Sequence, residues 1–363
     1  MMRVGVIGIG QGGCSVANIF AQNGYDCLGI NYSQSDLNSC PDVERKHLLI
    51  GSEGVGKDRA LATSLMQHNW EKTVEVVKEQ FSQTSTKLIF VLFSTGGGTG
   101  SGVSSIFLDL LANELDDKVI VAVPILPHKT ESAISHQNTL ECIKELSEVE
   151  VCILPIDNNR SSSSNKLFLY KEVNESFFTT IDDIINQTSL SSPYSNLDET
   201  DLLKLLSTVG WCTISQLNLV SMNGQVNLSK ESIIDSLDQS HSIFMKSNPS
   251  KVLRVGMTYH GQETLMKMIN PESITAKFTN SPLDIFEGWY PSSSEGKLRV
   301  VYTGLSFDRE RLNEIEYKTL SDTETLQNVL NQSHKVSVKT QVNLNKPTKQ
   351  RKSLSSILEK YKK

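Results

Sequence analysis

The chain has 363 residues, of which 38% are hydrophobic and 21% are charged. A chain of this length and composition can bury two ordinary cores, which excludes a fibrous or wholly disordered protein. Because no apolar run approaches the roughly 20 residues of a membrane-spanning helix, we expect no transmembrane segment. The first residues already read as a strand rather than a signal peptide, so we expect a cytoplasmic protein.

Charge is distributed unevenly along the chain. Residues 332–363 contain nine Lys and Arg and one acid, Glu359, and have a net charge of +8. The other residues contain 26 basic and 40 acidic side chains, a balance of −14. A block of like charge at a chain end is typical of an interaction tail, although a solvated, disordered tail would have the same composition.

The six cysteines are scattered without a Cys-x-x-Cys pair, and the seven histidines show no ligand spacing with them. We therefore expect reduced, mostly buried thiols. The same spacing predicts no structural metal site.

The chain begins with a strand, a glycine-rich turn and a helix. Residues 3–9 are strand-like, and a helix with one apolar face follows from Val16. Between them, residues 8–15 satisfy G-x-G-x-x-G in the strand–loop–helix context that cradles a phosphate. A dinucleotide site would also need an acid about 20 residues later, where the second strand ends. The residue there is Asn31, an amide, which counts against NAD.

A second segment, residues 51–58, nearly matches the P-loop pattern G-x-x-x-x-G-K-[S/T]. Its last position is Asp58, which repels phosphate and lacks the hydroxyl that binds magnesium, and no long strand precedes it. We therefore expect a mobile loop near the nucleotide rather than a P-loop, with Lys57 and Arg59 as possible phosphate neighbours.

The most informative stretch is Gly96-Gly-Gly-Thr-Gly-Ser-Gly102, in which five of seven residues are glycine. It joins an expected buried strand at residues 87–93 to a helix with apolar periodicity from Val103. Glycine at this density is costly in conformational entropy unless the backbone approaches another group closely. A loop that ends at a helix N-terminus directs N–H groups and the helix dipole at one point. The stretch therefore predicts a phosphate-binding loop, to which Thr99 and Ser101 add hydroxyls.

Strands and helices alternate after this loop. We expect strands at residues 118–124 and 150–155, with a helix at residues 134–146 between them. Such alternation indicates a parallel α/β sheet, whose ligands bind at the carboxyl ends of the strands. Three polar residues follow such strand ends: Asn31, Glu131 and Asp157. Together with the glycine-rich loops they predict one common site.

Residues 167–185 read as a long helix. Three of its residues lie roughly along one face: Tyr170, Asn174 and Phe178. On the pattern alone, a core role explains Tyr170 as well as a ligand contact does. After a break rich in Ser and Pro, another helix opens near Asp198, with Asp201 in its first turn. Acids at these positions are explained by helix capping about as often as by chemistry, so both interpretations stay open.

From about Trp211 the pattern predicts a second, smaller α/β domain without glycine-rich phosphate loops. We expect its strands at residues 213–220, 252–259 and 298–304, and its helices at residues 230–237 and 262–269. A charged helix follows at residues 308–330, before the basic tail.

The stretch at residues 96–102 is similar to the signature of the tubulin/FtsZ superfamily, and Gly10-Gln-Gly-Gly-Cys14 resembles the first phosphate loop of that family. Asn196-Leu-Asp198-x-x-Asp201 resembles the loop that FtsZ relatives insert into the nucleotide site of the neighbouring subunit. Further residues match in the family's order: Asn31, Glu131, Asp157, Asn158, Tyr170 and Asn174. The resemblance covers roughly residues 3–305.

The resemblance implies an α/β fold of the tubulin/FtsZ type: a parallel Rossmann-like GTPase sheet, a long central helix, a smaller α/β activation domain, a C-terminal helix and a basic tail. The boundaries that follow are 1–165 (GTP-binding domain), 166–186 (central helix), 187–210 (catalytic loop and following helix), 211–306 (activation domain), 307–331 (C-terminal helix) and 332–363 (basic tail).

The resemblance also implies a site for GTP or GDP with Mg²⁺, without a protein metal-ligand set. The implied nucleotide-binding residues are Gly10, Gln11, Gly12, Gly13, Cys14, Asn31, Gly96, Gly97, Gly98, Thr99, Gly100, Ser101, Gly102, Glu131, Asp157, Asn158, Tyr170 and Asn174. Asp198, Asp201 and Asn196 are implied to act on the nucleotide of the next subunit in a head-to-tail filament. GTP would then be hydrolysed only after assembly, because the two carboxylates that orient the attacking water come from the adjacent subunit.

Within the superfamily, the first phosphate loop, the segment at residues 31–36 and the basic end most resemble the TubZ partitioning tubulins of plasmids and phages. This implies a bacterial filament that moves DNA, with its tail bound to a DNA-bound adaptor protein. An FtsZ-like cell-division or scaffold filament is the alternative. A nicotinamide enzyme that uses residues 8–13 is disfavoured by Asn31 and by the second glycine-rich loop.

Overall fold

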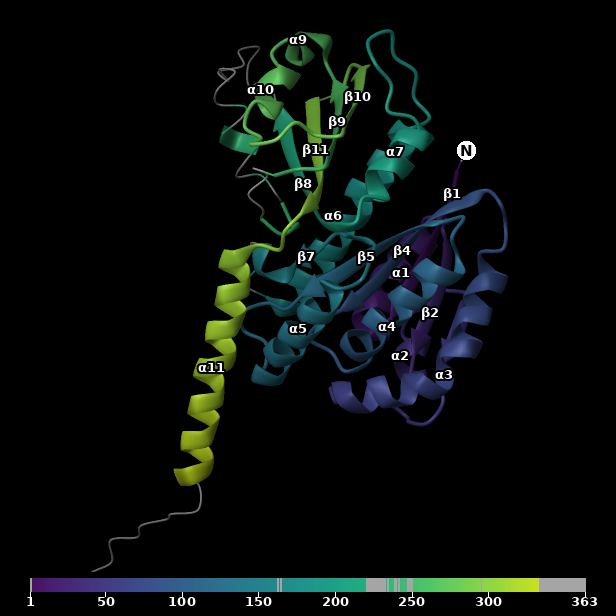
Figure 1. Ribbon diagram of the computed structural model, residues 1–363, viewed down its shortest axis with the longest axis vertical. Helices are drawn as coiled ribbons and strands as arrows, with labels where there is room; N and C mark the ends of the chain where they lie inside the picture. The colour runs from purple at the N-terminus through teal and green to yellow at the C-terminus, as the bar shows by residue number, and fades with distance from the viewer. Residues whose placement is uncertain are drawn as a thin grey trace, which may run out of the picture. The chain divides into compact units, whose positions relative to one another are not determined.

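The computed structural model describes residues 2–332, apart from residues 162, 164, 220–232, 234, 238, 239, 241, 247–250 and 295. Met1–Asp322 forms one compact unit, and a second unit begins at Thr323. Figure 1 shows the helices and strands of the described residues. Residues 333–363 of the basic tail and half of the helix expected at residues 230–237 fall outside the described residues; the described half, residues 233 and 235–237, is helical. In the part of the chain that is described, no helix is both long enough and apolar enough to span a membrane.

One mostly parallel sheet forms the centre of the first unit. Its amino-terminal strands are β1 (Arg3–Ile9), β2 (Asp26–Asn31), β3 (Arg45–Leu48), β4 (Thr86–Ser94), β5 (Val119–Leu126), β6 (Cys152–Ile153) and β7 (Ile156–Asp157). The later strands are β8 (Gly210–Leu219), β9 (Arg254–Gly261), β10 (Asp284–Pro291) and β11 (Gly296–Leu305). Their order is β10-β9-β11-β8-β6-β5-β4-β1-β2-β3, with β7 paired to β5. Strands expected in two domains therefore share one hydrogen-bonded sheet.

The strand directions differ between the two parts of the sheet. From β3 to β8 every described pair is parallel, as are β9 and β10. Strand β11 instead runs antiparallel to both β8 and β9. The carboxyl ends of β1, β2, β4 and β5 thus lie on one edge of the sheet, where ligands bind in such folds.

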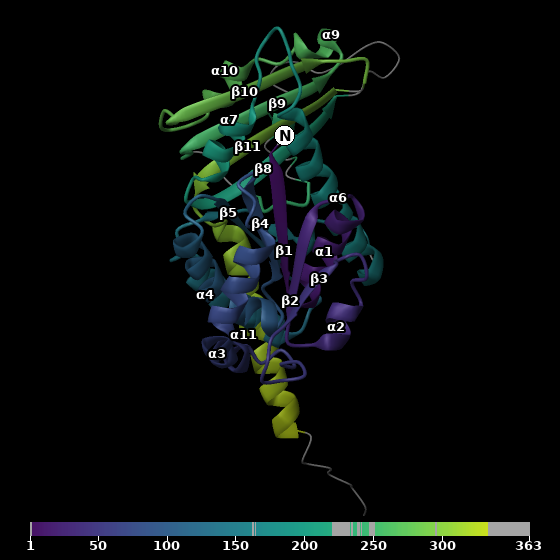
Figure 2. The same cartoon turned by 90° about the vertical axis from the view of Figure 1, so that its right-hand side faces the viewer.

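Helices cover both faces of the parallel part (Figure 2). The helices are α1 (Gly10–Gln22), α2 (Gln34–Asn38), α3 (Arg59–Gln80), α4 (Thr99–Glu114), α5 (Ala133–Leu146), α6 (Lys166–Gln187), α7 (Glu199–Leu206), α9 (Glu263–Met266), α10 (Pro271–Thr275) and α11 (Arg309–Gln332). Alternate residues of β1 enter two cores: Val4 and Val6 pack with α1 and α6, whereas Ile7 and Ile9 pack with α3 and α4. Burial on both faces explains why residues 88–93 of β4 read as an unbroken apolar run.

The expected α/β architecture is confirmed, and the differences lie mainly at element boundaries. Helix α1 begins at Gly10 and α4 at Thr99, so much of each glycine-rich stretch forms the first helical turns. The strand expected at residues 150–155 is reduced to the two residues of β6, followed by β7. Strands β3 and β10 and helices α2 and α10 are additional elements. All six cysteines are buried free thiols, as expected.

Candidate functional site

A cavity of about 620 Å³ lies at the carboxyl ends of β1, β4 and β5. It brings together residues from β1 to α6, separated by more than 160 positions along the chain. The sequence-predicted residues in its lining are Gly10, Gln11, Gly12, Asn31, Gly96, Gly97, Gly98, Thr99, Gly100, Glu131, Asn158, Tyr170 and Asn174. The segment expected near the nucleotide also lines it, through Gly54, Val55, Gly56 and Lys57. The lining residues that the sequence did not single out are Ile9, Ser15, Ser33, Asp36, Ser94 and Ile125.

Two helices begin in this cavity, α1 after Ile9 and α4 after Gly98. Neither N-cap side chain bonds to the helix, and neither helix has an acid in its first turn. Glycine is required here for two reasons. Gly10 has φ +69°, and a Cβ on Gly13 would lie 2.0 Å from the carbonyl oxygen of Leu92 in β4. The first turn of α1 therefore packs directly on β4, and both helix N-termini lie at the same edge of the sheet.

Lys57 lines the same cavity from the segment before α3. Its φ is +67°, and its Nζ donates to the hydroxyls of Ser132 (3.1 Å) and Ser135 (2.8 Å). The Asn138 amide of α5 donates to the Lys57 carbonyl (3.1 Å) and, more weakly, to the Gly97 carbonyl (3.4 Å). This bridge holds the Lys57 segment against the glycine-rich stretch. A cation with hydroxyl partners beside two helix N-termini suits an anionic ligand.

A second polar group lines the cavity at the end of β2. The Asn31 amide oxygen accepts from the Thr99 hydroxyl (3.3 Å), and its nitrogen donates to Asp36 (3.1 Å). Asp36 lies in the first turn of α2, which Ser33 caps. The sequence contained a signal for Asp36, since Ser33-x-x-Asp36 opens a helix directly after a strand end.

The long helix α6 contributes Tyr170 and Asn174. The Tyr170 hydroxyl donates to the carboxylate of Glu131 (3.0 Å), which links α6 to the loop before α5. Burial and the neighbouring Glu131 raise the pKa of this hydroxyl, so it stays protonated. Phe178, the third residue of the predicted stripe, is partly buried and packs edge-on against the core residue Phe20, with ring centroids 5.1 Å apart.

Several predicted nucleotide contacts lie outside the cavity lining. The Cys14 thiol is buried against the Gly8 carbonyl, and burial raises its pKa to about 12. Gly13, Ser101 and Gly102 serve packing: Ser101 bonds back to the Gly97 carbonyl, and a Cβ on Gly102 would lie 2.6 Å from the Arg59 carbonyl. Arg59 itself forms an ion pair with Glu145 of α5, away from the expected phosphate position.

Asp157 is also outside the lining, although its neighbour Asn158 is within it. Its carboxylate forms a buried ion pair with Arg311 of α11 (Nε–Oδ2 2.9 Å), whose Nη2 also donates to the Pro127 carbonyl (2.7 Å). Burial raises the pKa of Asp157, and Arg311 opposes that rise. The pair therefore anchors the start of α11 beside the cavity.

The three predicted catalytic residues lie near the amino ends of the parallel strands, opposite the cavity. Asp198 and Asp201 form a capping box at the start of α7: the Asp201 N–H donates to Asp198 (2.9 Å), and the Asp198 N–H donates to Asp201 (3.4 Å). Asn196 bonds locally, accepting from the Ser192 N–H at 2.7 Å. Glu199 accepts from the Met2 N–H at 2.6 Å, at the amino end of β1.

Strand β1 therefore separates the acids from the cavity. Its carboxyl end reaches the cavity at Ile9 and Gly10, whereas its amino end lies beside α7 (Figure 1). At about 3.3 Å per residue, the eight steps from Met2 to Gly10 span roughly 25 Å. Neither acid reaches the cavity of its own subunit.

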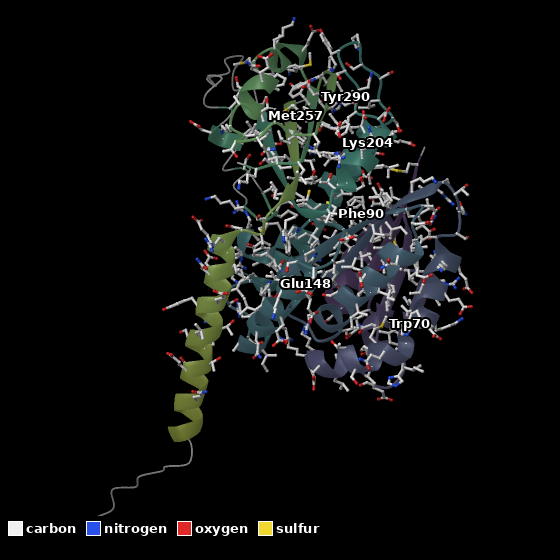
Figure 3. All side chains as sticks on the ribbon, viewed as in Figure 1. Trp70, Phe90, Glu148, Lys204, Met257 and Tyr290 are labelled. Carbon is white, nitrogen blue, oxygen red and sulfur yellow. The ribbon has the colours of Figure 1, made fainter. Side chains whose placement is uncertain are left out.

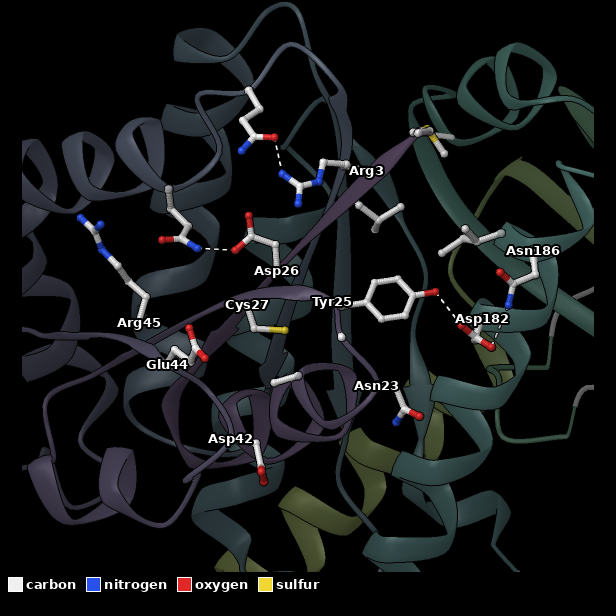
Figure 4. Close-up of a pocket in the computed structure, with 17 residues that line it drawn as sticks. Arg3, Asn23, Tyr25, Asp26, Cys27, Asp42, Glu44, Arg45, Asp182 and Asn186 are labelled. Carbon is white, nitrogen blue, oxygen red and sulfur yellow. Dashed lines mark hydrogen bonds between the residues drawn. The ribbon is translucent and has the colours of Figure 1, made fainter.

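A larger cavity, of about 900 Å³, lies at the amino ends of β1 and β2 (Figure 4). It is bounded by the C-terminal parts of α1 and α6, where the helix dipoles are negative. Four carboxylates line it, from Asp26, Asp42, Glu44 and Asp182, against two arginines. An anionic nucleotide is disfavoured there, so size alone does not identify the site.

A mostly parallel α/β sheet with two uncapped helix N-termini in one cavity is typical of proteins that bind a ligand with phosphate groups. Residues 3–165 match the model of the Tubulin/FtsZ family GTPase domain. The chain therefore contains a GTPase domain of the tubulin/FtsZ family, which confirms the resemblance seen in the sequence.

Relatives and solved structures extend this likeness. The tubulin-like protein CetZ of Pyrococcus horikoshii is 25% identical over 316 residues, 83% of this chain and 84% of that protein. The tubulin-like protein TubZ of Clostridium botulinum C phage is 27% identical over 206 residues, 55% of each chain. The GTPγS-form protofilament structure of Bacillus thuringiensis serovar israelensis TubZ superposes with a TM-score of 0.76 at 17% identity, over 92% of this chain and 95% of that one. The likeness thus includes both CetZ and TubZ.

Proposed function

We propose that the 620 Å³ cavity binds GTP or GDP, with the phosphates at the N-termini of α1 and α4 and the guanine beside Tyr170 and Asn174. The observation that carries this proposal is the start of two uncapped helices in one cavity. Their dipoles favour a multiply charged anion. The Tyr170 ring offers a stacking surface, and the Asn174 amide offers a donor and an acceptor to a base edge.

Magnesium would bind here mainly through the phosphates and water. Within the described residues no three His, Cys, Asp or Glu side chains lie together as a ready-made metal site. Asn31 and Asp36 supply side-chain oxygens in the cavity lining, and Mg²⁺ commonly uses one or two carboxylates together with substrate phosphates. The ion would supply charge stabilisation of the phosphates.

We infer that each subunit completes the site of its neighbour. Asp198 and Asp201 lie roughly 25 Å along β1 from their own cavity, so they need a second copy to act on a nucleotide. A head-to-tail contact would bring the two carboxylates to the phosphates of the next subunit, where they orient and activate the attacking water. The likeness to a TubZ protofilament structure supports this arrangement.

Electron microscopy of the full chain with GTP, with GTPγS and without nucleotide tests assembly. We expect filaments with either triphosphate and none without nucleotide. The GTPγS filaments should outlast the GTP filaments, because hydrolysis would weaken the contact. Dispersed subunits under all three conditions would contradict the proposal.

Lys57→Ala is expected to weaken GTP binding about tenfold, and GDP binding less. Its ammonium, which the Ser132 and Ser135 hydroxyls hold in the lining, would lose a charge-assisted bond to phosphate. Competition with a fluorescent nucleotide measures both dissociation constants. Lys72→Ala on the exposed part of α3 is the matched control. Unchanged affinity for both nucleotides in Lys57→Ala would remove Lys57 from the phosphate site.

We further propose that the filament segregates plasmid or phage DNA in a bacterial cytoplasm, through an adaptor bound by residues 332–363. The charge of this segment and the TubZ relative support the proposal. Deleting residues 332–363 should then abolish maintenance of the encoding replicon while sedimentable filaments persist. The tubulin-like protein CetZ is matched over 83% of this chain, more than the 55% matched by TubZ, so a role other than DNA segregation is the second candidate: a cell-division or scaffold filament. In that case the deletion leaves replicon maintenance unchanged.

A further inference from the structure

The loop between α6 and α7, residues 188–198, lies along the edge of β10. The Trp289 N–H donates to the Ser195 carbonyl (3.0 Å), which makes an antiparallel bridge between loop and strand. The Ser195 hydroxyl donates to the Glu287 carbonyl (2.9 Å), and the Ser192 hydroxyl donates to the Trp289 carbonyl. The edge strand of the sheet thus holds the loop that ends at Asp198.

The last of these contacts is made by the Tyr290 hydroxyl, which is buried at the end of β10 (Tyr290 is labelled in Figure 3). It accepts from the Leu197 N–H at 2.9 Å and donates to the Leu197 carbonyl at 3.3 Å. Its ring lies over the backbone of Gly288, where a Cβ would come within 2.7 Å of it. One hydroxyl therefore satisfies both backbone groups of the residue that immediately precedes Asp198.

We propose that Tyr290 is a positioning residue for the two carboxylates of Asp198 and Asp201. This inference rests on the proposed role of those acids in the neighbour's site. The capping box joins the acids to each other, so they move as one group. Tyr290 fixes the backbone at the point where that group joins the rest of the protein.

The Tyr290 hydroxyl affects the position of the loop more than the loss of a single hydrogen bond would suggest. Without it, the Leu197 N–H and carbonyl would be left buried and without a partner, and the loop would shift to reach water. Catalytic groups tolerate little displacement, since an error of about 1 Å can slow a reaction roughly a hundredfold. The shift would not touch the nucleotide cavity at the other end of β1.

The test compares Tyr290→Phe with Tyr259→Phe in the full chain. Tyr259 is a matched control, because it is a buried tyrosine on the adjacent strand β9 whose hydroxyl donates to the Gln262 carbonyl (2.9 Å) rather than to the loop at residues 188–198. We expect Tyr290→Phe to lower kcat for GTP at least tenfold. The KM and the amount of filament sedimented with GTPγS should stay within about twofold. Tyr259→Phe should leave all three values near those of the parent.

A double variant separates this inference from the proposed function. In an Asp201→Ala background, Tyr290→Phe should cause no further loss of kcat, because it acts through the same acids. Equal losses in both backgrounds, equal effects of the two tyrosine variants, or a loss of filaments in Tyr290→Phe would overturn the positioning role. Normal hydrolysis by Asp201→Ala alone would instead overturn the proposed function.

Discussion

Asp201→Ala is expected to lower the rate of GTP hydrolysis about a hundredfold or more, while filaments form and persist longer. Removal of one positioned acid or base typically costs 10²–10⁴-fold in rate. The nucleotide cavity at the other end of β1 is untouched, so affinity for GTP should not change. Phosphate release and sedimentation, measured on the same sample, check both statements.

Helix capping is the competing explanation for Asp201, and Asp201→Asn tests it. The amide keeps an oxygen that can accept the 3.4 Å bond from the Asp198 N–H, but it removes the charge. If the acid activates water, Asn and Ala slow hydrolysis alike. If the acid only caps α7, hydrolysis by Asp201→Asn stays near the parent value, and Asp201→Ala loses about 1 kcal/mol of stability.

Arg311→Met is expected to lower the free energy of unfolding by about 3–5 kcal/mol, the usual cost of leaving a buried charge without its partner. The side chains of Arg311 and Asp157 are 7% and 6% exposed. Arg45→Met is the matched control, since Arg45 and its partner Glu79 are 42% and 51% exposed and such pairs contribute less than about 1 kcal/mol. Urea denaturation of both variants measures the difference. Similar losses in both would show that the Asp157 pair is not a buried anchor.

The loss in free energy of unfolding that Arg311→Met causes should also depend on pH. Burial already raises the pKa of Asp157, and removal of the opposing guanidinium raises it further. The folded state then binds a proton more tightly than the unfolded state, so stability falls as pH rises above the ordinary Asp pKa of about 4. The gap between variant and parent should therefore be smaller at pH 5 than at pH 8.

Local pattern was enough to predict the strand–glycine–helix units, because β1 and β4 each bury apolar residues on both faces of the sheet. It was not enough to place the helix starts. Glycine is a poor helix former, yet α1 begins at Gly10 because close packing on β4 admits no side chain at Gly13. Tertiary contact decided that boundary.

The sequence could not predict which residues far apart along the chain contact each other. Asp157 follows a strand end, which predicts a ligand contact, but its partner is Arg311, 154 residues away. Phe178 shares a helix face with Tyr170, but it packs against Phe20 of α1 and does not line the cavity. The bridge from Asn138 to Lys57 likewise joins residues 81 positions apart, with no local signal at either.

The dependence of the GTP hydrolysis rate on protein concentration tests the central claim, that the acids of one subunit complete the site of the next. Because the acids lie roughly 25 Å along β1 from their own cavity, an isolated subunit would bind the nucleotide without carboxylates beside its phosphates. The rate per subunit should be near zero at high dilution, rise steeply at the concentration where filaments form, and then level off. A rate per subunit that is measurable and constant down to high dilution would contradict it.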